Sequence, residues 1–398
     1  MRHLFWRHFF RLLLFAIAIA EWVTAYWIVR GLLGVSAPNW LHLAAPLGIH
    51  ALNRAILRSP PPRDGLALTL RRIYTGAAFT SVYCLMFLAL FMGAAEIIWW
   101  TGRALGLGSE PSAAVRYGTV ARSLGTGGVL AIVAAMIYGY TRGGKRVWVN
   151  EITSALRGLP PSLEGLRIAQ LSDVHLGPLM HADAIARHVE RVNRLEPDLV
   201  VITGDITDGL DHAARTFPAL GGLRAPLGVV AILGNHDVAT GTEAVKEALA
   251  RYTRFKVLDD ETMEIIRGTA RFWVVGLMDR GLDWARGLRR CAVLEKLVRE
   301  VPREEPMIVL SHRPDLFPHA VELGCNLVLS GHTHGGQVGI PWGRNRAATL
   351  ARFMTRFPRG SYRLGEGLLH VNLGLGMTGQ PVRVGTPREI TLITLRSA

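Results

Sequence analysis

The sequence predicts an all-α membrane region followed by an α/β domain, and three observations support this division near residue 150. Hydrophobic residues make up 49% of the 398 residues, and the long apolar runs fall within residues 1–150. Residues 151–398 alternate short apolar runs with helical patterns, as expected for strands and helices packed in layers. Polar motifs directly follow several of the short runs, at strand ends where loops converge in α/β domains.

Four segments in residues 1–150 are candidate membrane spans by length and apolarity. They run over about residues 9–29, 38–57, 74–100 and 120–140. The second is the weakest because it contains two histidines, an asparagine and an arginine, so an interfacial helix is its alternative. Ala18-Ile19-Ala20 resembles a signal-peptidase site, but the apolar run continues to Leu33, which favours an uncleaved anchor.

The distribution of basic residues predicts the orientation of the chain. Residues 1–150 carry 15 Lys and Arg against 4 acidic residues, whereas residues 151–398 carry 30 against 27. With four spans, 11 of the first 15 basic residues fall on the side of the N-terminus and 4 on the other. Because Lys and Arg collect on the cytoplasmic side, we expect an integral protein of the inner, cytoplasmic membrane with residues 151–398 in the cytoplasm. The basic excess flanks the membrane, which favours membrane lipids as partners and argues against nucleic acid.

Residues 151–398 show six buried strands and two helices. The strands are expected at residues 166–171, 198–203, 229–233, 272–277, 307–310 and 326–329, and the helices at 181–195 and 242–252. Three cysteines, Cys84, Cys291 and Cys325, make no disulfide framework and are compatible with a reducing compartment.

Five motifs with metal-binding side chains follow these strands in one order along the chain. They are Asp173-Val174-His175, Gly204-Asp205 with Asp208, Gly234-Asn235-His236-Asp237, His312, and Gly331-His332-Thr333-His334. Carboxylate, carboxamide and imidazole groups are ligands for borderline divalent metals, and two such metals form a phosphoryl-transfer centre. One Asp-x-His is common by chance, but five motifs in order at strand ends are not. The glycines before Asp205, Asn235 and His332 allow sharp turns and close approach of the backbone.

This ordered set resembles the calcineurin-like metallophosphoesterase superfamily over about residues 165–398. The extension of the last motif through Gln337, and the later run containing Arg383 and Glu389, are similar to its membrane-associated branch. The resemblance implies a four-layered αββα sandwich with two mixed sheets. Residues 151–398 would form this catalytic domain, and residues 1–150 a transmembrane region of about four helices.

The resemblance also implies a role for each motif residue. Two divalent ions, Mn, Fe or Zn, would be bound by seven ligands: Asp173, His175 and His334 for the first ion, Asn235, His312 and His332 for the second, and Asp205 bridging both. His236 and Asp208 would be the catalytic pair, with His236 stabilising charge or protonating the leaving oxygen and Asp208 orienting its imidazole. A hydroxide bridging the metals would attack phosphorus.

Three functions are compatible with this resemblance. The leading hypothesis is a membrane-anchored hydrolase of a phosphodiester or pyrophosphate in a lipid-linked substrate, such as UDP-2,3-diacylglucosamine or a phospholipid. The second is a phosphodiesterase for soluble nucleotides whose membrane half is only an anchor. The third is a non-catalytic membrane sensor or scaffold with a structural metal site, against which the intact His236 and Asp208 argue.

Two features near the motifs each have two interpretations on the sequence. Arg313 is either a phosphate contact or a solvated charge. Within residues 345–359, four apolar side chains alternate with arginines, which favours a basic, apolar rim that dips into the membrane over a plain surface loop. The apolar residues are Leu350, Phe353, Met354 and Phe357, and the arginines are Arg346, Arg352, Arg356 and Arg359.

Overall fold

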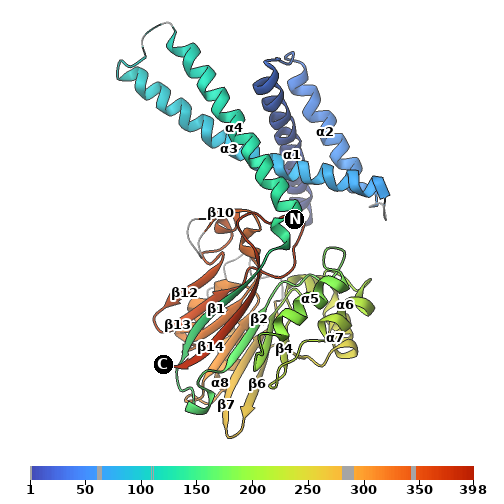
Figure 1. The fold of residues 1–398 in the computed structure, drawn as a ribbon, viewed down its shortest axis with the longest axis vertical. Helices are drawn as coiled ribbons and strands as arrows, with labels where there is room; N and C mark the ends of the chain where they lie inside the picture. Colours follow the sequence, from blue (N-terminus) through green and yellow to red (C-terminus); the bar gives the residue numbers. More distant parts are fainter. Residues whose placement is uncertain (1, 61–64, 109, 111, 280–290, 342–346) are drawn as a thin grey trace. The chain divides into compact units, whose positions relative to one another are not determined.

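A computed structural model describes residues 2–60, 65–108, 110, 112–279, 291–341 and 347–398 (Figure 1). The chain divides into two compact units, Met1–Tyr138 and Gly139–Ala398. This division falls inside the last long helix of the membrane region. Arg346, one of the predicted rim residues, lies outside the described residues.

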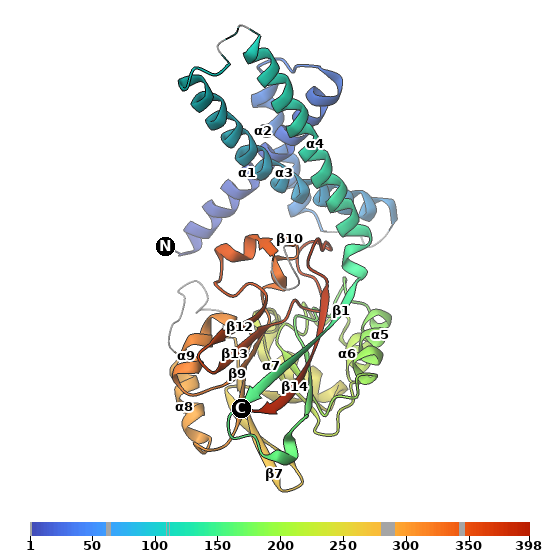
Figure 2. The ribbon, with the colours of Figure 1, turned by 60° about the vertical axis from the view of Figure 1, so that its left-hand side comes forward.

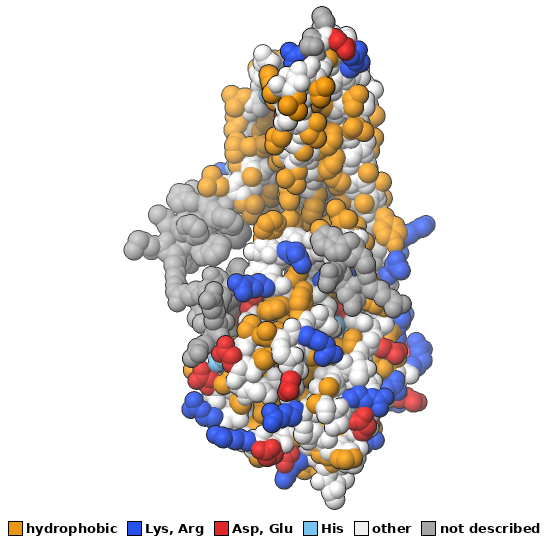
Figure 3. Space-filling model, turned by 90° about the vertical axis from the view of Figure 1, so that its left-hand side faces the viewer, with side chains coloured by type: hydrophobic (Ala, Val, Ile, Leu, Met, Phe, Trp, Pro, Cys, Tyr) orange, Lys and Arg blue, Asp and Glu red, His pale blue; other side chains and the backbone are white. Residues whose placement is uncertain are grey.

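The first unit is made of four long helices, α1 (Arg2–Leu33), α2 (Leu41–Arg58), α3 (Gly65–Ala104) and α4 (Ala113–Thr141). Among the described residues, three stretches are long and apolar enough to cross a membrane: Leu12–Leu33, Gly65–Ala104 and Ala113–Lys145. Hydrophobic side chains cover much of the surface of these helices, as expected for contact with lipid tails (Figure 3). The helix α2 falls outside this set of three, which agrees with its weak apolarity in the sequence.

Polar side chains join α2 to its neighbours. Asn53 of α2 donates a hydrogen bond to Glu21 of α1 at 2.7 Å and accepts one from the Tyr74 hydroxyl of α3 at 2.8 Å. One of the polar residues that weaken α2 as a span, Asn53, is therefore satisfied inside the helical unit.

The second unit contains two six-stranded mixed sheets. The first sheet has the order β1 (Val147–Leu156), β14 (Arg388–Ser397), β2 (Arg167–Leu171), β3 (Leu199–Thr203), β4 (Val229–Ile232) and β5 (Lys256–Leu258). The second sheet has the order β12 (Gly360–Leu364), β13 (Gly367–Val371), β9 (Leu327–Ser330), β8 (Met307–Ser311), β7 (Ala270–Leu277) and β6 (Glu261–Arg267). A short hairpin, β10 (Gly339–Pro341) and β11 (Ala347–Thr349), stands apart from both.

Three hydrophobic cores separate four layers. Side chains of both sheets meet in the central core, so the sheets pack face to face. The outer face of the first sheet packs against α5 (Ala182–Asn193), α6 (Ala213–Leu220) and α7 (Asn235–Tyr252). The outer face of the second packs against α8 (Ala292–Glu300) and α9 (Phe317–Glu322), and Figure 2 shows these helices beside β9. The αββα sandwich with two mixed sheets is confirmed.

The buried strands illustrate why the sequence forms these layers. In β3, Leu199 and Val201 face the other sheet, whereas Val200 and Ile202 face the helices. Successive side chains of a strand point to opposite faces, so a strand covered on both sides must be apolar at every position.

All six predicted strands and both predicted helices are present, and one helix begins earlier than expected. The helix α7 starts at Asn235 rather than near residue 242, with a break at Gly241, whose φ is 122°. Asn235 and His236 therefore lie on the first helical turn. The apolar patterns of the sequence do not predict the strands β1, β5, β6 and β10 to β14, nor the helices α6, α8 and α9.

Candidate metal centre

The predicted site residues come together from the carboxyl ends of five strands. In the first sheet β2, β3 and β4 are neighbours, and in the second sheet β8 and β9 are neighbours. Each strand is followed within five residues by site residues, which are Asp173 and His175, Asp205 and Asp208, Asn235 and His236, His312, and His332 and His334. Because the sheets face each other, the loops of both meet at one edge of the sandwich.

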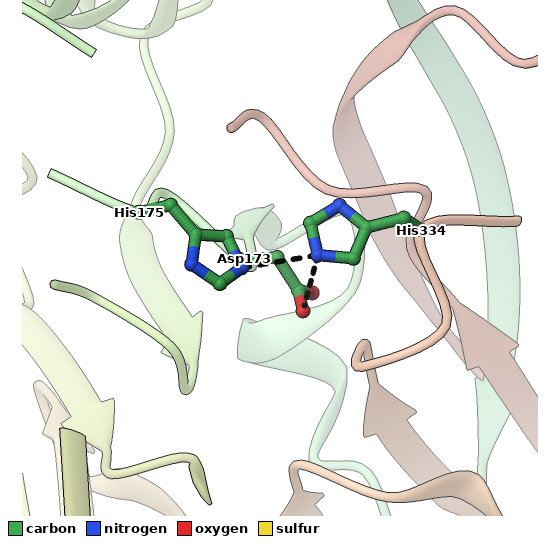
Figure 4. Close-up of side chains that lie close together, drawn as sticks. All are labelled: Asp173, His175 and His334. Carbon is green, nitrogen blue, oxygen red and sulfur yellow. Dashed lines mark hydrogen bonds and ion pairs between the residues drawn. The ribbon is translucent and has the colours of Figure 1, made fainter. Parts of the chain in front are cut away.

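The first ligand group consists of Asp173, His175 and His334, all buried (Figure 4). The Nε2 atoms of the two histidines are 3.0 Å apart, and Nε2 of His334 lies 3.4 Å from a carboxylate oxygen of Asp173. Three ligand atoms this close could hold one metal ion.

The second ligand group consists of Asp205, His312 and His332. Nε2 of His312 lies 3.2 Å from Oδ2 of Asp205 and 3.2 Å from Nδ1 of His332. The same oxygen of Asp205 lies 3.8 Å from Nε2 of His175 in the first group. Asp205 is thus between the two groups, as a bridging carboxylate would be. Asn235 is linked to this group through Arg313, which contacts Nε2 of His332 at 2.7 Å and donates to Oδ1 of Asn235 at 3.2 Å.

Hydrogen bonds to the remote ring nitrogens hold two of these imidazoles in position. Nδ1 of His175 is 2.7 Å from Asp208, and Nδ1 of His312 is 2.8 Å from the carbonyl oxygen of Thr203. An imidazole that donates through Nδ1 keeps the lone pair of Nε2 free for a metal. The donor set therefore fits divalent metal ions on its chemistry as well as on its spacing.

The site also favours neutral imidazoles at two ligand positions. Burial lowers the pKa of His332 and of His334 well below the usual range, and neighbouring cationic groups lower it further. Burial opposes ionisation of Asp205, but the nearby His312 outweighs it and holds the pKa of this carboxyl below its usual range. Neutral imidazole and ionised carboxylate are the metal-binding forms, so His332, His334 and Asp205 favour metal binding. At His312, in contrast, Asp205 and Asp173 outweigh burial and raise the pKa to about 10, so this imidazole would lose a proton when a metal binds.

Backbone conformation sets this centre apart from the rest of the domain. Among the described residues, only eight residues other than glycine have a positive φ, and five of them are predicted ligands: Asp173, His175, Asp205, His332 and His334. Such conformations cost about 1–3 kcal/mol each and persist where the surroundings enforce them. Hydrogen bonds from the backbone help to enforce these conformations. The N–H group of His332 donates to the carboxylate of Asp173 at 3.0 Å, and that of His236 donates to Asp205 at 2.8 Å.

The glycines before three ligands are required by close packing, as the sequence suggests. A Cβ atom on Gly204 would lie 2.6 Å from Nδ1 of His312. A Cβ on Gly234 would overlap the Asp205 side chain, and one on Gly331 would overlap Ser172.

Asp208 and His236 are in contact, as predicted. Nδ1 of His236 lies 2.8 Å from Oδ1 of Asp208, and hydrogen bonds from His175 and His236 outweigh burial and lower the pKa of Asp208 to about 2. The hydrogen bond to Asp208 raises the pKa of His236. His236 is 37% exposed and faces a cavity.

This cavity has a volume of about 280 Å³ and lies beside both ligand groups. Its lining includes Asp205, His236, His332, His334, Arg313 and Met354. Arg313 is only 14% exposed, pairs with Asp279 at 2.6 Å and contacts His332 at 2.7 Å and Asn235 at 3.2 Å. The solvated-charge interpretation of Arg313 is therefore wrong, because its guanidinium is held at the site.

The segment after the β10–β11 hairpin is only partly the rim that the sequence predicts. Phe353 is 88% exposed and Met354 is 64% exposed, and Met354 also lines the cavity. In contrast, Phe357 is partly buried and packs against the core beneath α8 and α9, and Arg359 is buried with a hydrogen bond to the Gly385 carbonyl at 3.1 Å. These two residues belong to the domain interior and not to an exposed surface.

Two supporting residues were not assigned a role from the sequence. Asp237 is buried and accepts backbone hydrogen bonds from Ile206, Thr207 and Gly234, which ties the loops after β3 and β4 together. Arg383 is 1% exposed, and its guanidinium lies 3.3 Å from Nδ1 of His334. Both residues lie in segments that the sequence analysis singled out, Asp237 in the motif Gly234 to Asp237 and Arg383 in the later run. The sequence did not indicate which groups they would contact.

Comparison with known proteins agrees with the fold and the site. The model of a family described as calcineurin-like phosphoesterase matches residues 166–336. The chain belongs to the calcineurin-like metallophosphoesterase family and is a phosphoester hydrolase with membrane helices.

Several relatives match two thirds of the chain or more. A transmembrane protein with metallophosphoesterase domain from Bos taurus is 31% identical over 338 residues, which are 80% of this chain and 72% of the relative. Its namesake from Danio rerio is 32% identical over 68% of this chain, and the match spans 63% of that relative's length, less than two thirds. An uncharacterized metallophosphoesterase, YkuE, from Bacillus subtilis (strain 168) is 32% identical over 67% of this chain and 92% of the relative.

Proposed function

We propose that this chain hydrolyses a phosphodiester or pyrophosphate in a lipid-linked substrate, at the cytoplasmic face of the inner membrane and with two divalent ions. The observation that carries the lipid part is the position of Met354. It lines the cavity together with His332 and His334, while its neighbour Phe353 is exposed. Exposed apolar side chains at the mouth of a polar cavity suit a substrate that carries both a phosphate group and acyl chains. A membrane anchor raises the local concentration of such a substrate.

The ligand groups would hold the two ions as the resemblance implies. Asp173, His175 and His334 would hold one, Asn235, His312 and His332 the other, and Asp205 would serve both. When bound, ions such as Mn, Fe or Zn lower the pKa of water and stabilise charge on phosphoryl oxygens.

Two side chains of the cavity would act on the substrate directly. The raised pKa of His236 keeps its imidazole protonated to higher pH, so it can donate a proton to the leaving oxygen. Arg313, fixed by Asp279, presents a guanidinium to the cavity and would contact phosphoryl oxygens.

A substrate panel tests the lipid proposal. The full chain in lipid nanodiscs with Mn²⁺ would be assayed on UDP-2,3-diacylglucosamine, on a phospholipid and on a soluble nucleotide phosphodiester. We expect a higher kcat/KM for an acylated substrate. Turnover of the soluble compound alone would reject the lipid proposal and support the soluble-nucleotide alternative.

A surface substitution sharpens this test. We expect Phe353→Ser to lower kcat/KM on the acylated substrate by about tenfold, because the proposed contact between the phenyl ring and an acyl chain is lost, and to leave kcat/KM on the soluble substrate unchanged. Ile266→Ser is the control, because Ile266 is an exposed apolar residue of β6. Equal effects of both substitutions would remove the case for an acyl contact at Phe353.

The scaffold alternative predicts a different outcome for His236. A scaffold with a structural metal site keeps its cellular role in His236→Ala, whereas a hydrolase loses about 10²–10⁴-fold in kcat when it loses its proton donor. His236 is outside both ligand groups, so the metal content of the variant should be that of the wild-type chain.

A further inference from the structure

The membrane unit contains a polar cavity that the hydrolase site does not use. Its volume is about 510 Å³, and it lies between α1, α3 and α4. Two arginines line it, Arg30 near the end of α1 and Arg122 in α4, together with Glu96, Tyr117, Trp27 and Thr126. All of these residues belong to the same compact unit.

The two arginines have no carboxylate partner among the described residues. Arg30 donates to the hydroxyl of Tyr26 at 3.2 Å, and Arg122 donates to the Gly118 carbonyl at 3.2 Å. The one acid in the cavity lining, Glu96, accepts instead from Tyr117 at 2.8 Å. A cation inside a membrane-spanning helix is costly unless an anion or the interface offsets it. The cavity therefore keeps a net positive charge that suits an anion.

Two hydrogen-bond donors in the cavity lining also lack a partner. Thr126 is 6% exposed, and within the described part of the chain neither its hydroxyl nor Nε1 of Trp27 has a hydrogen-bond partner. A buried polar atom without a partner is destabilising, so a ligand oxygen at this position would stabilise the folded helices. The helices α1 and α4 approach closely here, since a Cβ on Gly31 would overlap the Thr126 side chain.

An apolar cavity adjoins the polar one. It has a volume of about 440 Å³, lies between α3 and α4, and includes Ile98, Trp99 and Leu124 in its lining. Tyr117 and Ala121 line both cavities. A free phosphate ion would use only the polar cavity, whereas a phospholipid would place its headgroup in one and an acyl chain in the other.

We propose that these adjoining cavities bind one anionic phospholipid, with its phosphate at Arg30 and Arg122 and an acyl chain between α3 and α4. Guanidinium groups bind phosphate oxygens through charge-assisted hydrogen bonds, and the Thr126 hydroxyl adds a neutral donor. The site is separate from the hydrolase centre, so this proposal does not depend on the proposed substrate.

Lipid retention by the full chain tests the proposal. The chain would be purified in detergent, exposed to phosphatidylglycerol or phosphatidylcholine, and analysed by native mass spectrometry. We expect one phosphatidylglycerol to be retained in preference to phosphatidylcholine. In Arg30→Gln/Arg122→Gln, retention should be about tenfold weaker, since two charge-assisted contacts are lost. Arg116→Gln is the matched control, because Arg116 is also in α4 but pairs with Glu110.

A second variant keeps the test valid if the double variant does not fold. Thr126→Val preserves shape and removes a hydroxyl that has no protein partner, so the chain should fold at least as well and yet retain less phosphatidylglycerol. Equal retention of both lipids by the wild-type chain, equal losses in Arg116→Gln and the double variant, or unchanged retention in Thr126→Val would each overturn the proposal. Displacement of the lipid by inorganic phosphate alone would replace it with a simple phosphate site.

Discussion

Oδ1 of Asp208 lies 2.8 Å from Nδ1 of His236, and the same oxygen lies 2.7 Å from Nδ1 of His175. One carboxylate thus orients both an imidazole of the first ligand group and the imidazole that faces the cavity. Since an anion stabilises a nearby imidazolium, Asp208 links the position of a ligand to the protonation of the proposed proton donor.

Replacing Asp208 by Asn should affect both functions. The amide keeps the shape but loses the charge, so the pKa of His236 should fall toward its ordinary value. If protonated His236 donates the proton, the alkaline limb of the kcat profile moves to lower pH, and kcat falls by about 10–100-fold. Steady-state kinetics against pH would measure this. The control is Asp211→Asn, an exposed acid in the same loop region, which should leave the profile in place.

Removal of metal should lower stability as well as activity. Without cations, Asp173 and Asp205 are buried carboxylates in one site, and burial and the proximity of Asp205 raise the pKa of Asp173. A metal ion stabilises the folded chain by binding it in preference to the unfolded chain. We expect dialysis against a chelator to abolish hydrolysis and lower the thermal midpoint by several degrees, and Mn²⁺ to restore both. A midpoint insensitive to chelator, in protein shown by elemental analysis to have lost its metal, would contradict ligation by these groups.

The grouping of the candidate ligands could be predicted from the sequence because each lies in a short motif directly after an apolar strand. Five such strands end at the same edge of the sandwich, so local patterns were enough to predict that Asp173, Asp205 and His312 lie close together. The supporting contacts could not be predicted in this way. The carboxylate of Asp237 accepts from the backbone N–H groups of Ile206 and Thr207 in another loop, and every residue except proline carries such a group.

The strands β1 and β14 escaped prediction for a related reason. They pair in parallel from opposite ends of the domain, and Figures 1 and 2 show them side by side. Asn150 interrupts the apolar pattern of β1, yet it is buried and donates to Glu389 of β14 at 2.7 Å. Polar groups that satisfy each other across a sheet look like loop residues in a single sequence.

His188 of α5 should make the stability of the second unit depend on pH. Burial, together with Arg388 and two arginines of its own helix, lowers its pKa from 6.5 to about 4. Between these values the unfolded chain binds more protons than the folded chain, so stability falls as pH falls from 6.5 toward 4. The effect is about 3 kcal/mol at most.

The variant His188→Gln should remove this contribution. The difference between its thermal midpoint and that of the wild-type chain should therefore change between pH 7.5 and pH 5, by about 2–4 °C per kcal/mol. Titration of the metal centre is common to both proteins and cancels. His181→Gln, an exposed histidine at the start of the same helix, is the control. A constant difference between His188→Gln and wild type across this range would mean that His188 titrates normally.

The proposed cytoplasmic location of the hydrolase domain depends on whether α2 crosses the membrane. Eighteen helical residues extend about 27 Å, close to the thickness of the hydrocarbon core, and the ties from Asn53 to Glu21 and Tyr74 reduce the cost of its polar residues. We therefore expect α2 to cross, which gives four spans and places both termini on the side of the 11 basic residues.

Labelling of single cysteines in intact cells distinguishes crossing from interfacial placement of α2. In a background that lacks the three native cysteines, Ser36→Cys lies between α1 and α2, Ser59→Cys lies directly after α2, and Ser397→Cys lies at the end of β14. If α2 crosses, an impermeant maleimide labels the first from outside and reaches the other two only after the cells are permeabilised. If α2 lies in the interface, the cysteines at 36 and 59 are on the same side of the membrane and label alike. The helices α3 and α4 then cross the membrane twice, so the chain after α4 lies on that side as well. The second pattern would place the hydrolase domain with the α1–α2 loop, opposite the N-terminus, and the positive-inside argument would no longer support a cytoplasmic site.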